Sequence, residues 1–407
     1  MNVRREKYDK REMKLRRSRQ KVVGVVVEHG RAYGRGICEG IAAFAQEHGG
    51  WELLALDLAD VRKPHVVDGY IARVTDRDIA AVLRKTGRPV VDVYGAFPCG
   101  AFARVDSDHD MVGRLAAHHF MEHRFKNYAF YGFEGVPFSD ARRKAFVDCL
   151  KQNCFPCAVC PTSKDVRTTF NFSTFFRNER FTLRADSRRV GAWLKHLAKP
   201  VAVFCSHDLC AYQLAQICRA SGIDVPREVA ILGVDDDTLL CAFSATMLSS
   251  VDPNAFGIGR AAAEALGRIL DGCPAAGIDI KVEPKGIVVR PSTEVYPFQP
   301  FWLSDALVFI RRNVAKGLTA ADVYEFLNLS HTPVDRAFRE VLHSSVQREI
   351  VRVRFEEACR LLGNTTLSVK EIAARTGFSR LEYFCNRFKD KLGVSPLEWR
   401  AGTNGRG

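Results

Sequence analysis

Short apolar runs alternate with longer amphipathic stretches over residues 21–291 of the chain. Each run has the length of a buried strand, and the stretches between them repeat apolar residues every three or four positions, as helices do. Strands that alternate with helices form a parallel sheet covered by helices on both faces, so this region is predicted to be an α/β domain. The predicted strands are KVVGVVV, WELLALD, PVVDVY, YAFYGF, PVAVFC and VAILGV, and the predicted helices are residues 36–46, 111–121, 141–150, 209–220 and 256–270.

Residues 368–400 show a purely helical pattern, typical of two helices joined by a tight turn. Gly377 can supply the left-handed position of that turn, and Ser379 can cap the second helix by accepting its first backbone N–H groups. Phe384 and Phe388 would anchor the second helix in a core. The opposite side of this helix is a short polar edge that fits the major groove of DNA, formed by Glu382, Cys385, Asn386 and Lys389.

Residues 318–342 repeat this helix-turn-helix design. Asn328 takes the turn position of the glycine, which is a mild change because Asn tolerates a positive φ. Ser330 can cap the second helix, and Val334 and Phe338 would anchor it. The side chains predicted to face outward, toward DNA, are Thr332, Asp335, Arg336 and Arg339.

The string IAxxxGFxxxxYFxxxFKxxxGxSPxxWR, over residues 372–400, resembles the AraC/XylS family of transcription regulators position by position. A long helix over residues 345–362 would join the two helix-turn-helix units. Two units joined by one helix form the all-α DNA-binding domain of that family, and the resemblance covers residues 303–400. It implies binding to a double-stranded DNA operator.

Charge is distributed unevenly along the 407 residues, whose formal net charge is +13. Residues 1–20 hold nine basic and three acidic side chains, and residues 301–407 hold seventeen basic and twelve acidic ones. Positive charge at the two ends suits contact with a polyanion, while the nearly neutral middle suits a small uncharged ligand. The basic tail is also consistent with a solubilising leader.

The sequence gives no sign of membrane insertion, secretion or a metal centre. No apolar run approaches the length of a membrane-spanning helix or a signal-peptide core, so the protein is expected in the cytoplasm, with its thirteen cysteines reduced. Cys154, Cys157 and Cys160 have a spacing that can hold zinc or an iron–sulfur cluster. They lie where a helix runs into a strand, which would scatter the thiols, and no metal is predicted.

A glycine pattern offers an alternative class, a dinucleotide-dependent enzyme. Gly34, Gly36 and Gly40 follow a strand, and Asp57 closes the next one, in the outline of a dinucleotide fold. Six residues separate the end of the first strand, Val27, from the first glycine, whereas the fingerprint needs its glycines within the turn itself. Neither a cofactor nor an enzymatic activity is therefore predicted.

Several runs of the α/β domain resemble the sugar-binding domain of LacI/GalR-type regulators. They are RKAF, PVAVFCSHDLCA, IDVPREVAILGVDDD and LSSVDPNAFGIGRAAAE, in the order of that family. The resemblance implies a two-lobed α/β domain of the type I periplasmic-binding-protein-like class. The predicted parts are a basic tail (1–20), a ligand-binding domain (21–292), a linker (293–302) and a DNA-binding domain (303–402), with an insertion at 162–185.

Sugar ligands need carboxylates and guanidinium groups at the carboxyl ends of parallel strands. Asp235 and Asp236 follow VAILGV, His207 and Asp208 follow PVAVFC, and Arg142 begins the helix after YAFYGF. The first strand is followed by further candidates, which are His29, Arg31 and Tyr33. Each of these residues could instead be a helix cap or part of a structural ion pair.

By the LacI/GalR resemblance, Arg142 matches the Arg of the R-x-x-G/A-aromatic motif and Asp235 matches the sugar-binding Asp. His207 and Asp208 match an Asn-Asp pair, from which His207 departs. An α/β sugar domain placed before two AraC-type units resembles the xylose-responsive activators of the AraC/XylS family. The resemblance implies a homodimer that responds to a small neutral sugar, a pentose such as xylose, and acts on RNA polymerase. A sugar receptor without DNA function is the alternative.

Overall fold

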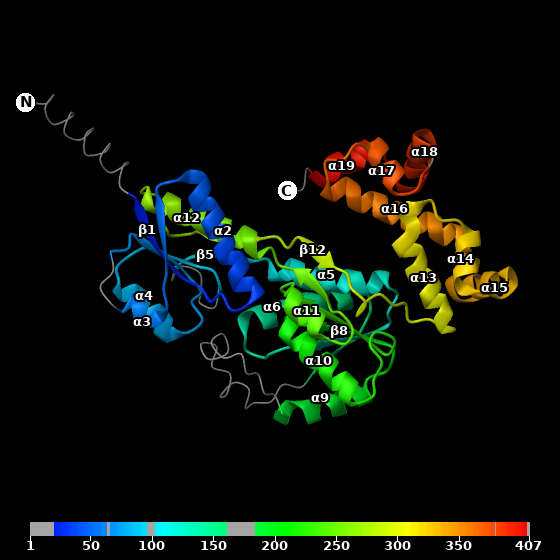
Figure 1. The fold of residues 1–407 in the computed structure, drawn as a ribbon, viewed down its shortest axis with the longest axis horizontal. Helices are drawn as coiled ribbons and strands as arrows, with labels where there is room; N and C mark the ends of the chain where they lie inside the picture. The colour runs from blue at the N-terminus through cyan, green and yellow to red at the C-terminus, as the bar shows by residue number, and fades with distance from the viewer. Residues whose placement is uncertain (1–19, 63–65, 96–101, 161–183, 379, 405–407) are drawn as a thin grey trace, which may run out of the picture. The chain divides into compact units, whose positions relative to one another are not determined.

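The computed structural model describes residues 20–62, 66–95, 102–160, 184–378 and 380–404. The chain divides into two compact units, Met1–Thr293 and Glu294–Gly407 (Figure 1). Residues 1–19 of the predicted tail and 162–183 of the predicted insertion lie outside the described residues. No helix in the described part of the chain is long and apolar enough to cross a membrane.

The first lobe of the first unit is built on six parallel strands in the order β11-β5-β4-β3-β1-β2. The strands are β1 (Lys21–Val26), β2 (Trp51–Ala55), β3 (Gly69–Ala72), β4 (Val90–Asp92), β5 (Ala103–Ser107) and β11 (Asp279–Val282). Apolar residues of α2 (Ala32–His48) and α12 (Ala255–Leu270) pack on one face of the sheet, and those of α3 (Leu58–Val61) and α4 (Arg77–Lys85) on the other.

The second lobe has a similar sheet in the order β12-β10-β9-β8-β6-β7, in which only β12 is antiparallel to its neighbour. Its strands are β6 (Asn127–Tyr131), β7 (Cys157–Val159), β8 (Val201–Cys205), β9 (Val229–Val234), β10 (Ser249–Asp252) and β12 (Gly286–Val288). Its helices are α5 (His109–Glu122), α6 (Pro137–Gln152), α9 (Arg184–His196), α10 (Asp208–Ala220) and α11 (Thr238–Phe243). The α/β fold predicted from the alternation and the two lobes implied by the LacI/GalR resemblance are both confirmed.

Three neighbouring connections join the lobes, after β5, after β10 and after β11. Backbone hydrogen bonds tie them together: Asp108 N–H donates to Val282 O (2.8 Å) and Lys285 N–H donates to Asp252 O (3.0 Å). The side-chain amide of Asn254 donates to Glu283 O (3.1 Å). Because the three connections lie side by side, they can act together as a hinge between the lobes.

The glycines of the dinucleotide-like pattern serve packing instead. A Cβ atom at Gly34 would lie 1.7 Å from Glu28 O, and one at Gly40 would lie 2.1 Å from Phe256 O of α12. A Cβ atom at Gly259 of α12 would lie 2.0 Å from Ile37 O of α2. Glycine at 40 and 259 lets α2 and α12 approach each other closely across the face of the first sheet, whereas glycine at 34 lets the start of α2 approach the segment after β1.

The second unit is helical throughout its regular elements, as predicted. It contains α13 (Phe301–Asn313), the 3₁₀ turn η1 (Val314–Lys316), α14 (Ala320–Leu327), α15 (His331–Leu342), α16 (Val346–Asn364), α17 (Val369–Arg375), α18 (Leu381–Leu392) and α19 (Pro396–Asn404). Ile350 and Val353 of α16 lie in a core with α13–α15, whereas Phe355 and Ala358 lie in a core with α17 and α18. The predicted linking helix therefore belongs to both helix-turn-helix units.

The predicted turn positions are confirmed, while the predicted caps differ. Gly377 has φ +79° and Asn328 has φ +52°, both in the left-handed region. Ser330 occupies the N-cap position of α15, but its side chain makes no capping hydrogen bond. Helix α18 begins at Leu381 with Arg380 as its N-cap residue, and Ser379 lies outside the described residues.

The close approach of α2 and α12 predicts that Gly259→Ala destabilises the first unit by about 1–3 kcal/mol, because the added methyl group overpacks the contact. Gly267→Ala is the matched control on the same helix, since its Cβ would make ordinary contacts with the rings of Trp51 (3.4 Å) and Phe44 (4.0 Å). We expect that control to be neutral or to add up to about 1 kcal/mol from helix propensity. Urea unfolding measures both, and equal effects of the two variants would contradict this packing.

Candidate functional site

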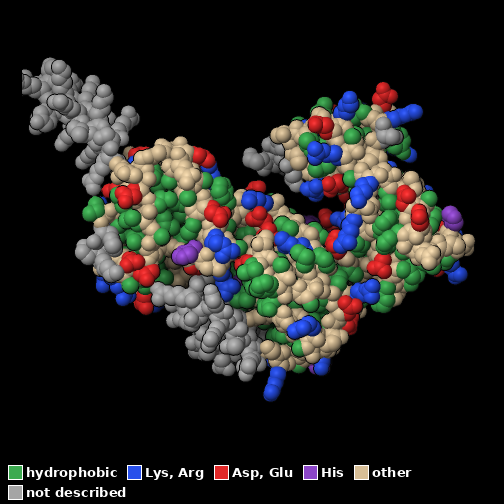
Figure 2. Space-filling model, viewed as in Figure 1, with side chains coloured by type: hydrophobic (Ala, Val, Ile, Leu, Met, Phe, Trp, Pro, Cys, Tyr) green, Lys and Arg blue, Asp and Glu red, His purple; other side chains and the backbone are tan. Residues whose placement is uncertain are grey.

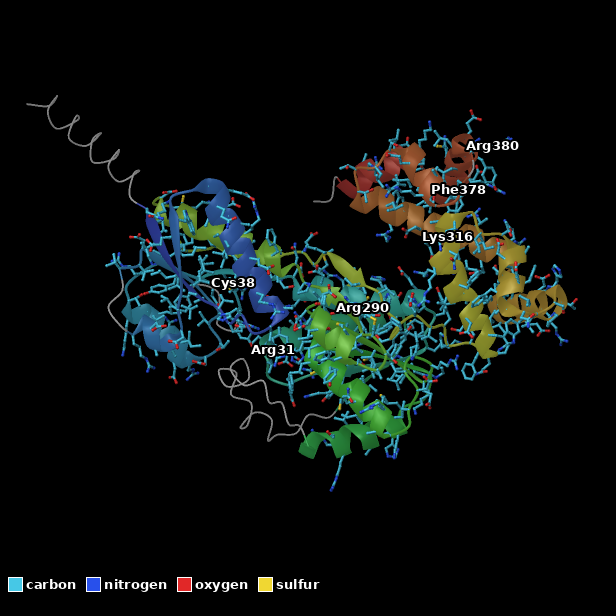
Figure 3. The ribbon with its side chains drawn as sticks, in the orientation of Figure 1. Arg31, Cys38, Arg290, Lys316, Phe378 and Arg380 are labelled. Carbon is cyan, nitrogen blue, oxygen red and sulfur yellow. The ribbon has the colours of Figure 1, made fainter. Side chains whose placement is uncertain are left out.

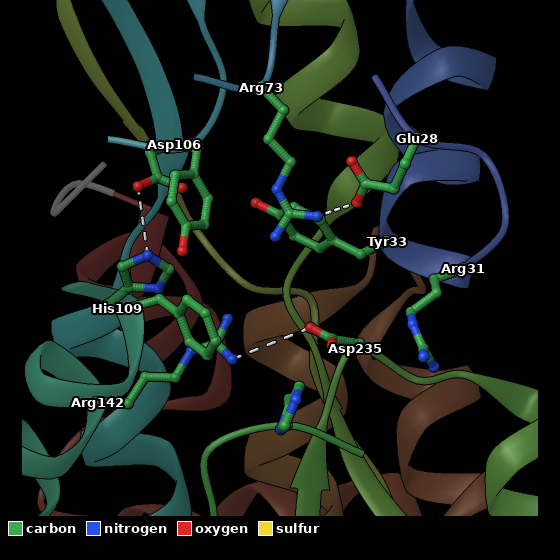
Figure 4. Close-up of a pocket in the computed structure, with 11 residues that line it drawn as sticks. Glu28, Arg31, Tyr33, Arg73, Asp106, His109, Arg142 and Asp235 are labelled. Carbon is green, nitrogen blue, oxygen red and sulfur yellow. Dashed lines mark hydrogen bonds and ion pairs between the residues drawn. The ribbon is translucent and has the colours of Figure 1, made fainter. Parts of the chain in front are cut away.

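A cavity lies between the two lobes of the first unit, at the carboxyl ends of their strands (Figure 4). The first lobe contributes Glu28, Arg31, Tyr33, Arg73, Tyr94 and Asp106, and the second contributes His109, Phe138, Arg142, His207 and Asp235.

The wall from the first lobe is built around Arg73, which is buried directly after β3. Its guanidinium group pairs with the Glu28 carboxylate and lies over the rings of Tyr33 and Tyr94, 5.2 and 4.9 Å from their centroids. Burial alone would lower the pKa of Arg73, but Glu28 raises it above its usual value. Arg73 is therefore held in place as a permanent positive charge.

The wall from the second lobe is built around Arg142 of α6. Its Nη1 donates to Ser206 O (2.5 Å) and lies 4.0 Å from Asp235 Oδ1, while the guanidinium carbon lies 5.1 Å from the centroid of the Phe138 ring. Within the described part of the chain, Arg142 Nε and His109 Nδ1 are buried without a hydrogen-bond partner. Polar atoms left in this way at a cavity wall are suited to contact a polar ligand.

Asp235 lies on a strained turn. It has φ +114° and the next residue, Asp236, has φ +46°, although neither is glycine. The turn is held by β10, because Asp235 N–H donates to Val251 O (3.0 Å) and Asp236 N–H donates to Ser250 Oγ (3.0 Å). Each such residue costs about 1–3 kcal/mol, and strain of this kind is concentrated at binding sites.

Electrostatics set the protonation of the pocket. Burial raises the pKa of Asp235 to about 6, against the opposing effect of Arg142. Burial, reinforced by Arg142, lowers the pKa of His207 to about 3, so His207 is neutral at neutral pH. Burial opposes ionisation of Asp106, but His109, whose Nε2 lies 3.3 Å from Asp106 Oδ2, helps to hold its pKa below the usual value.

Positive and negative groups of the pocket balance. Arg31, Arg73 and Arg142 face three carboxyl groups, those of Glu28, Asp106 and Asp235 (Figure 4). A phosphorylated ligand would need an excess of positive charge, which this balanced set does not provide. The arrangement suits a small neutral ligand with several hydroxyl groups, because each hydroxyl can donate to a carboxylate and accept from a guanidinium group.

Five of the predicted ligand residues line the cavity, namely Arg31, Tyr33, Arg142, His207 and Asp235. Asp208 lies behind it, fully buried, where it accepts from Ser250 Oγ (2.7 Å) and from the Asp237 backbone N–H (2.7 Å). Asp236 pairs with Arg290 (2.6 Å). His29 lines a separate surface pocket at the ends of β1, β2 and β3.

Sequence reasoning missed six lining residues: Glu28, Arg73, Tyr94, Asp106, His109 and Phe138. Three of them carry the signal used for the second lobe, because Arg73 follows β3, Tyr94 follows β4, and Asp106 lies near the end of β5. The run containing Tyr94 was identified as a strand. Applying the same strand-end argument to the first lobe would have selected Tyr94, but not Arg73 or Asp106, because β3 and β5 were not among the predicted strands.

The cysteine cluster is spread over different environments. Cys154 is exposed, Cys157 is half-buried in β7, and Cys160 is buried in the apolar core of the second lobe. Among the residues that the structure describes, no group of three His, Cys, Asp or Glu side chains could hold a metal ion.

The predicted DNA-facing residues lie on α15 and α18 of the helical unit. Six are exposed: Thr332, Arg336, Arg339, Glu382, Asn386 and Lys389. Asp335 and Cys385 are half-buried; Asp335 accepts from the Tyr324 hydroxyl (2.8 Å), which turns it toward its own unit. Tyr383, 47% exposed on α18, is a further surface residue that the helical pattern did not select. Lys and Arg side chains stand out on this unit in Figure 2.

Two family models match the chain in the order of the two units. A periplasmic binding protein-like domain matches residues 117–293, and a helix-turn-helix domain matches residues 324–402. The same order is found in a solved structure described as the xylose-binding transcription activator XylR. It is 24% identical, with a TM-score of 0.59, and the match covers 93% of this chain and 97% of that one. This likeness supports the two-part fold.

Curated relatives match both the whole chain and its helical part. The xylose operon regulatory protein of Haemophilus influenzae is 24% identical over 395 residues, which are 93% of this chain and 97% of the relative. The HTH-type transcriptional activator AarP of Providencia stuartii is 32% identical over 108 residues, which are 26% of this chain and 80% of AarP. Both relatives are named as regulators of transcription.

Proposed function

Since the chain belongs to the AraC/XylS family of helix-turn-helix transcription regulators, in its XylR-like form with a periplasmic-binding-protein-like domain in front, we propose that D-xylose or a similar pentose is its effector. The observation that carries the proposal is the charge-balanced cavity between the lobes. Neutral sugars present several hydroxyl groups of the kind that such a cavity can pair. The choice of xylose rests on the names of the full-length relatives.

Arg142 and Asp235 are the central contacts in this proposal, with His207, Arg31 and Tyr33 around them and Arg73 opposite. Asp235 would accept from sugar hydroxyls, and the free Nε of Arg142 would donate to a sugar oxygen. Asp208 and Asp236, which were predicted to contact the sugar, would instead hold the turn in place through their own hydrogen bonds and ion pair. The aromatic face of Phe138 offers a surface for the C–H side of a sugar ring.

The helical domain, taken as residues 303–402, would place α15 and α18 in successive major grooves of the operator. Thr332, Asp335, Arg336 and Arg339 would contact DNA from the first helix, and Glu382, Cys385, Asn386 and Lys389 from the second. A homodimer would carry four such units onto tandem half-sites. The basic tail, residues 1–20, would add contacts with phosphate groups.

Closure of the lobes around the sugar would shift the population of the dimer between two arrangements with different operator affinity. The activator would then act on RNA polymerase at the promoter. In this account the protein works in the cytoplasm and catalyses no reaction, because the pocket groups serve to hold a ligand.

The raised pKa of Asp235 predicts how sugar binding depends on pH. Sugar hydroxyls donate to the ionised carboxylate, so D-xylose affinity should be constant above pH 7 and fall about tenfold by pH 5, as the group with pKa about 6 takes up a proton. Asp235→Asn should lose about 1.5–3 kcal/mol of binding at pH 7.5 and lose this pH dependence. Isothermal titration calorimetry measures both.

Asp271→Asn is the control for this experiment, because Asp271 is an exposed carboxylate paired with Lys21 on the outside of the first lobe. It should bind D-xylose as the parent does. Full-strength binding by Asp235→Asn would remove Asp235 from the site. Failure of the parent to bind any sugar in a panel of neutral pentoses and hexoses would overturn the proposed effector class.

The exposed faces of α15 and α18 predict the effect of two substitutions on DNA binding. Against a duplex that the protein selects from a random library, Arg336→Ala and Asn386→Ala should each cost about 1–3 kcal/mol while leaving D-xylose binding unchanged. Arg260→Ala is the control, because Arg260 is an exposed, ion-paired arginine of the ligand-binding unit. Fluorescence anisotropy measures the affinities, and parental binding by both variants would show that other residues read the operator.

A further inference from the structure

The segment that leaves the ligand-binding unit is bound tightly to the second sheet. Ser292 N–H donates to Met247 O (3.0 Å), and Ser292 O accepts from Ile231 N–H of β9 (2.9 Å). The Ser292 hydroxyl donates to Ile231 O (2.6 Å) and accepts from Ser249 N–H of β10 (2.8 Å). Ser292 and Thr293 are completely buried. The last residues before the helical unit are therefore fixed to β9 and β10, the strands that position the strained turn at 235–237.

Arg290 joins this exit segment to the strained turn by its side chain. Its Nη2 donates to Asp236 Oδ1 (2.6 Å), and its Nη1 donates to Leu248 O (2.9 Å). The Arg290 side chain is 13% exposed and that of Asp236 is 22% exposed, so the pair is shielded from solvent far more than a surface ion pair. Arg290 is labelled in the second lobe in Figure 3.

Hydroxyl groups continue the contact to the end of the unit. The Arg290 N–H donates to Ser249 Oγ (2.8 Å), and that hydroxyl donates back to Arg290 O (2.8 Å). Ser249 Oγ has then used its single proton, so Thr293 Oγ1, 2.7 Å away, must donate to it. Thr293 Oγ1 in turn accepts from His119 Nε2 (2.9 Å). The donors therefore run in one direction, from His119 through Thr293 and Ser249 to Arg290 O, and they include Thr293, the last residue of the ligand-binding unit.

We propose that Arg290 is a positioning residue that couples the strained turn of the sugar site to the exit segment at Thr293. The proposal rests on the sugar-responsive function proposed above. A sugar that binds Asp235 must adjust the turn, whose next residue is held by Arg290, and the hydroxyls of Ser249 and Thr293 carry that adjustment to the junction. In this proposal the turn is the element that changes between two arrangements, as coupling requires.

Arg290→Met tests this coupling, because it keeps the apolar stem of the side chain and removes the guanidinium group. The quantity measured is the ratio of the dissociation constants for the selected duplex with and without saturating D-xylose, by fluorescence anisotropy. In Arg290→Met this ratio should lie at least fivefold closer to one than it does in the parent. Arg290→Lys should restore part of the difference from one. Arg260→Met is the control, because it removes an exposed ion pair whose N···O distance, 2.6 Å, equals that of the Arg290–Asp236 pair. It should keep the parental ratio.

Thr293→Val provides a second test in case Arg290→Met folds poorly. It removes only the hydroxyl group that links Ser249 to His119, far along the chain from the pocket residues. It should lower the ratio while D-xylose affinity in the absence of DNA stays within twofold of the parent. A parental ratio in both folded variants would overturn the coupling role. A ratio of one in the parent itself would instead overturn the sugar-responsive function, and this inference with it.

Discussion

The turn at residues 235–237, directly after β9, is the constraint on which the rest of the sugar site depends. Two consecutive aspartates adopt positive φ, a conformation that L-residues avoid, and the turn persists because β10 and Arg290 hold it. That geometry points Asp235 into the cavity beside Arg142 and turns Asp236 away toward Arg290. A relaxed turn would present the two carboxylates differently and would break the charge balance of the pocket.

The architecture could be predicted from the sequence because it is encoded locally. Apolar periodicity predicted strands β1, β2, β4, β6, β8 and β9, but not β3, β5, β7, β10, β11 or β12. The two helix-turn-helix units follow from Gly377, Asn328 and the apolar anchors of their second helices. The glycines at 34, 36 and 40 show the limit of this approach. Their pattern is consistent with a phosphate-binding loop or with packing. The contacts decide for packing, because Gly34 approaches Glu28 while Gly36 and Gly40 approach α12, more than 200 residues away in sequence.

The candidate site could be predicted in part. The argument that ligand residues follow parallel strands placed Arg142, His207 and Asp235 together, and the structure has all three at one cavity. The reason is that the carboxyl ends of parallel strands meet at one edge of a sheet. It could not separate Asp235 from Asp208 and Asp236, since all three follow strands and only backbone conformation and hydrogen bonding determine which one faces the cavity. Arg73 was missed because the strand before it, β3, was not predicted, and because its contacts with Glu28 and Tyr94 join residues that are distant in sequence.

These contacts give the two lobes of the ligand-binding unit different roles. The first lobe supplies a rigid wall in which Arg73 is locked by Glu28 and two tyrosine rings, whereas the second lobe supplies the strained turn and the segment that leads to the DNA-binding unit. Under the coupling proposed above, the side of the cavity that responds to the sugar is the side that continues into the DNA-binding unit. Near-neutral charge in the pocket and positive charge in the helical unit keep the two kinds of ligand apart.

The central claim is that one sugar-binding event and one DNA-binding event share a conformational equilibrium, and linkage makes the claim testable from the sugar side. The measurement is the dissociation constant of D-xylose, obtained by calorimetry on the full chain alone and saturated with its selected duplex. The account predicts that the two constants differ by about 5–150-fold, the range of allosteric coupling. Equal constants would contradict it, because a sugar whose affinity is unchanged by bound DNA cannot change the affinity of the protein for DNA.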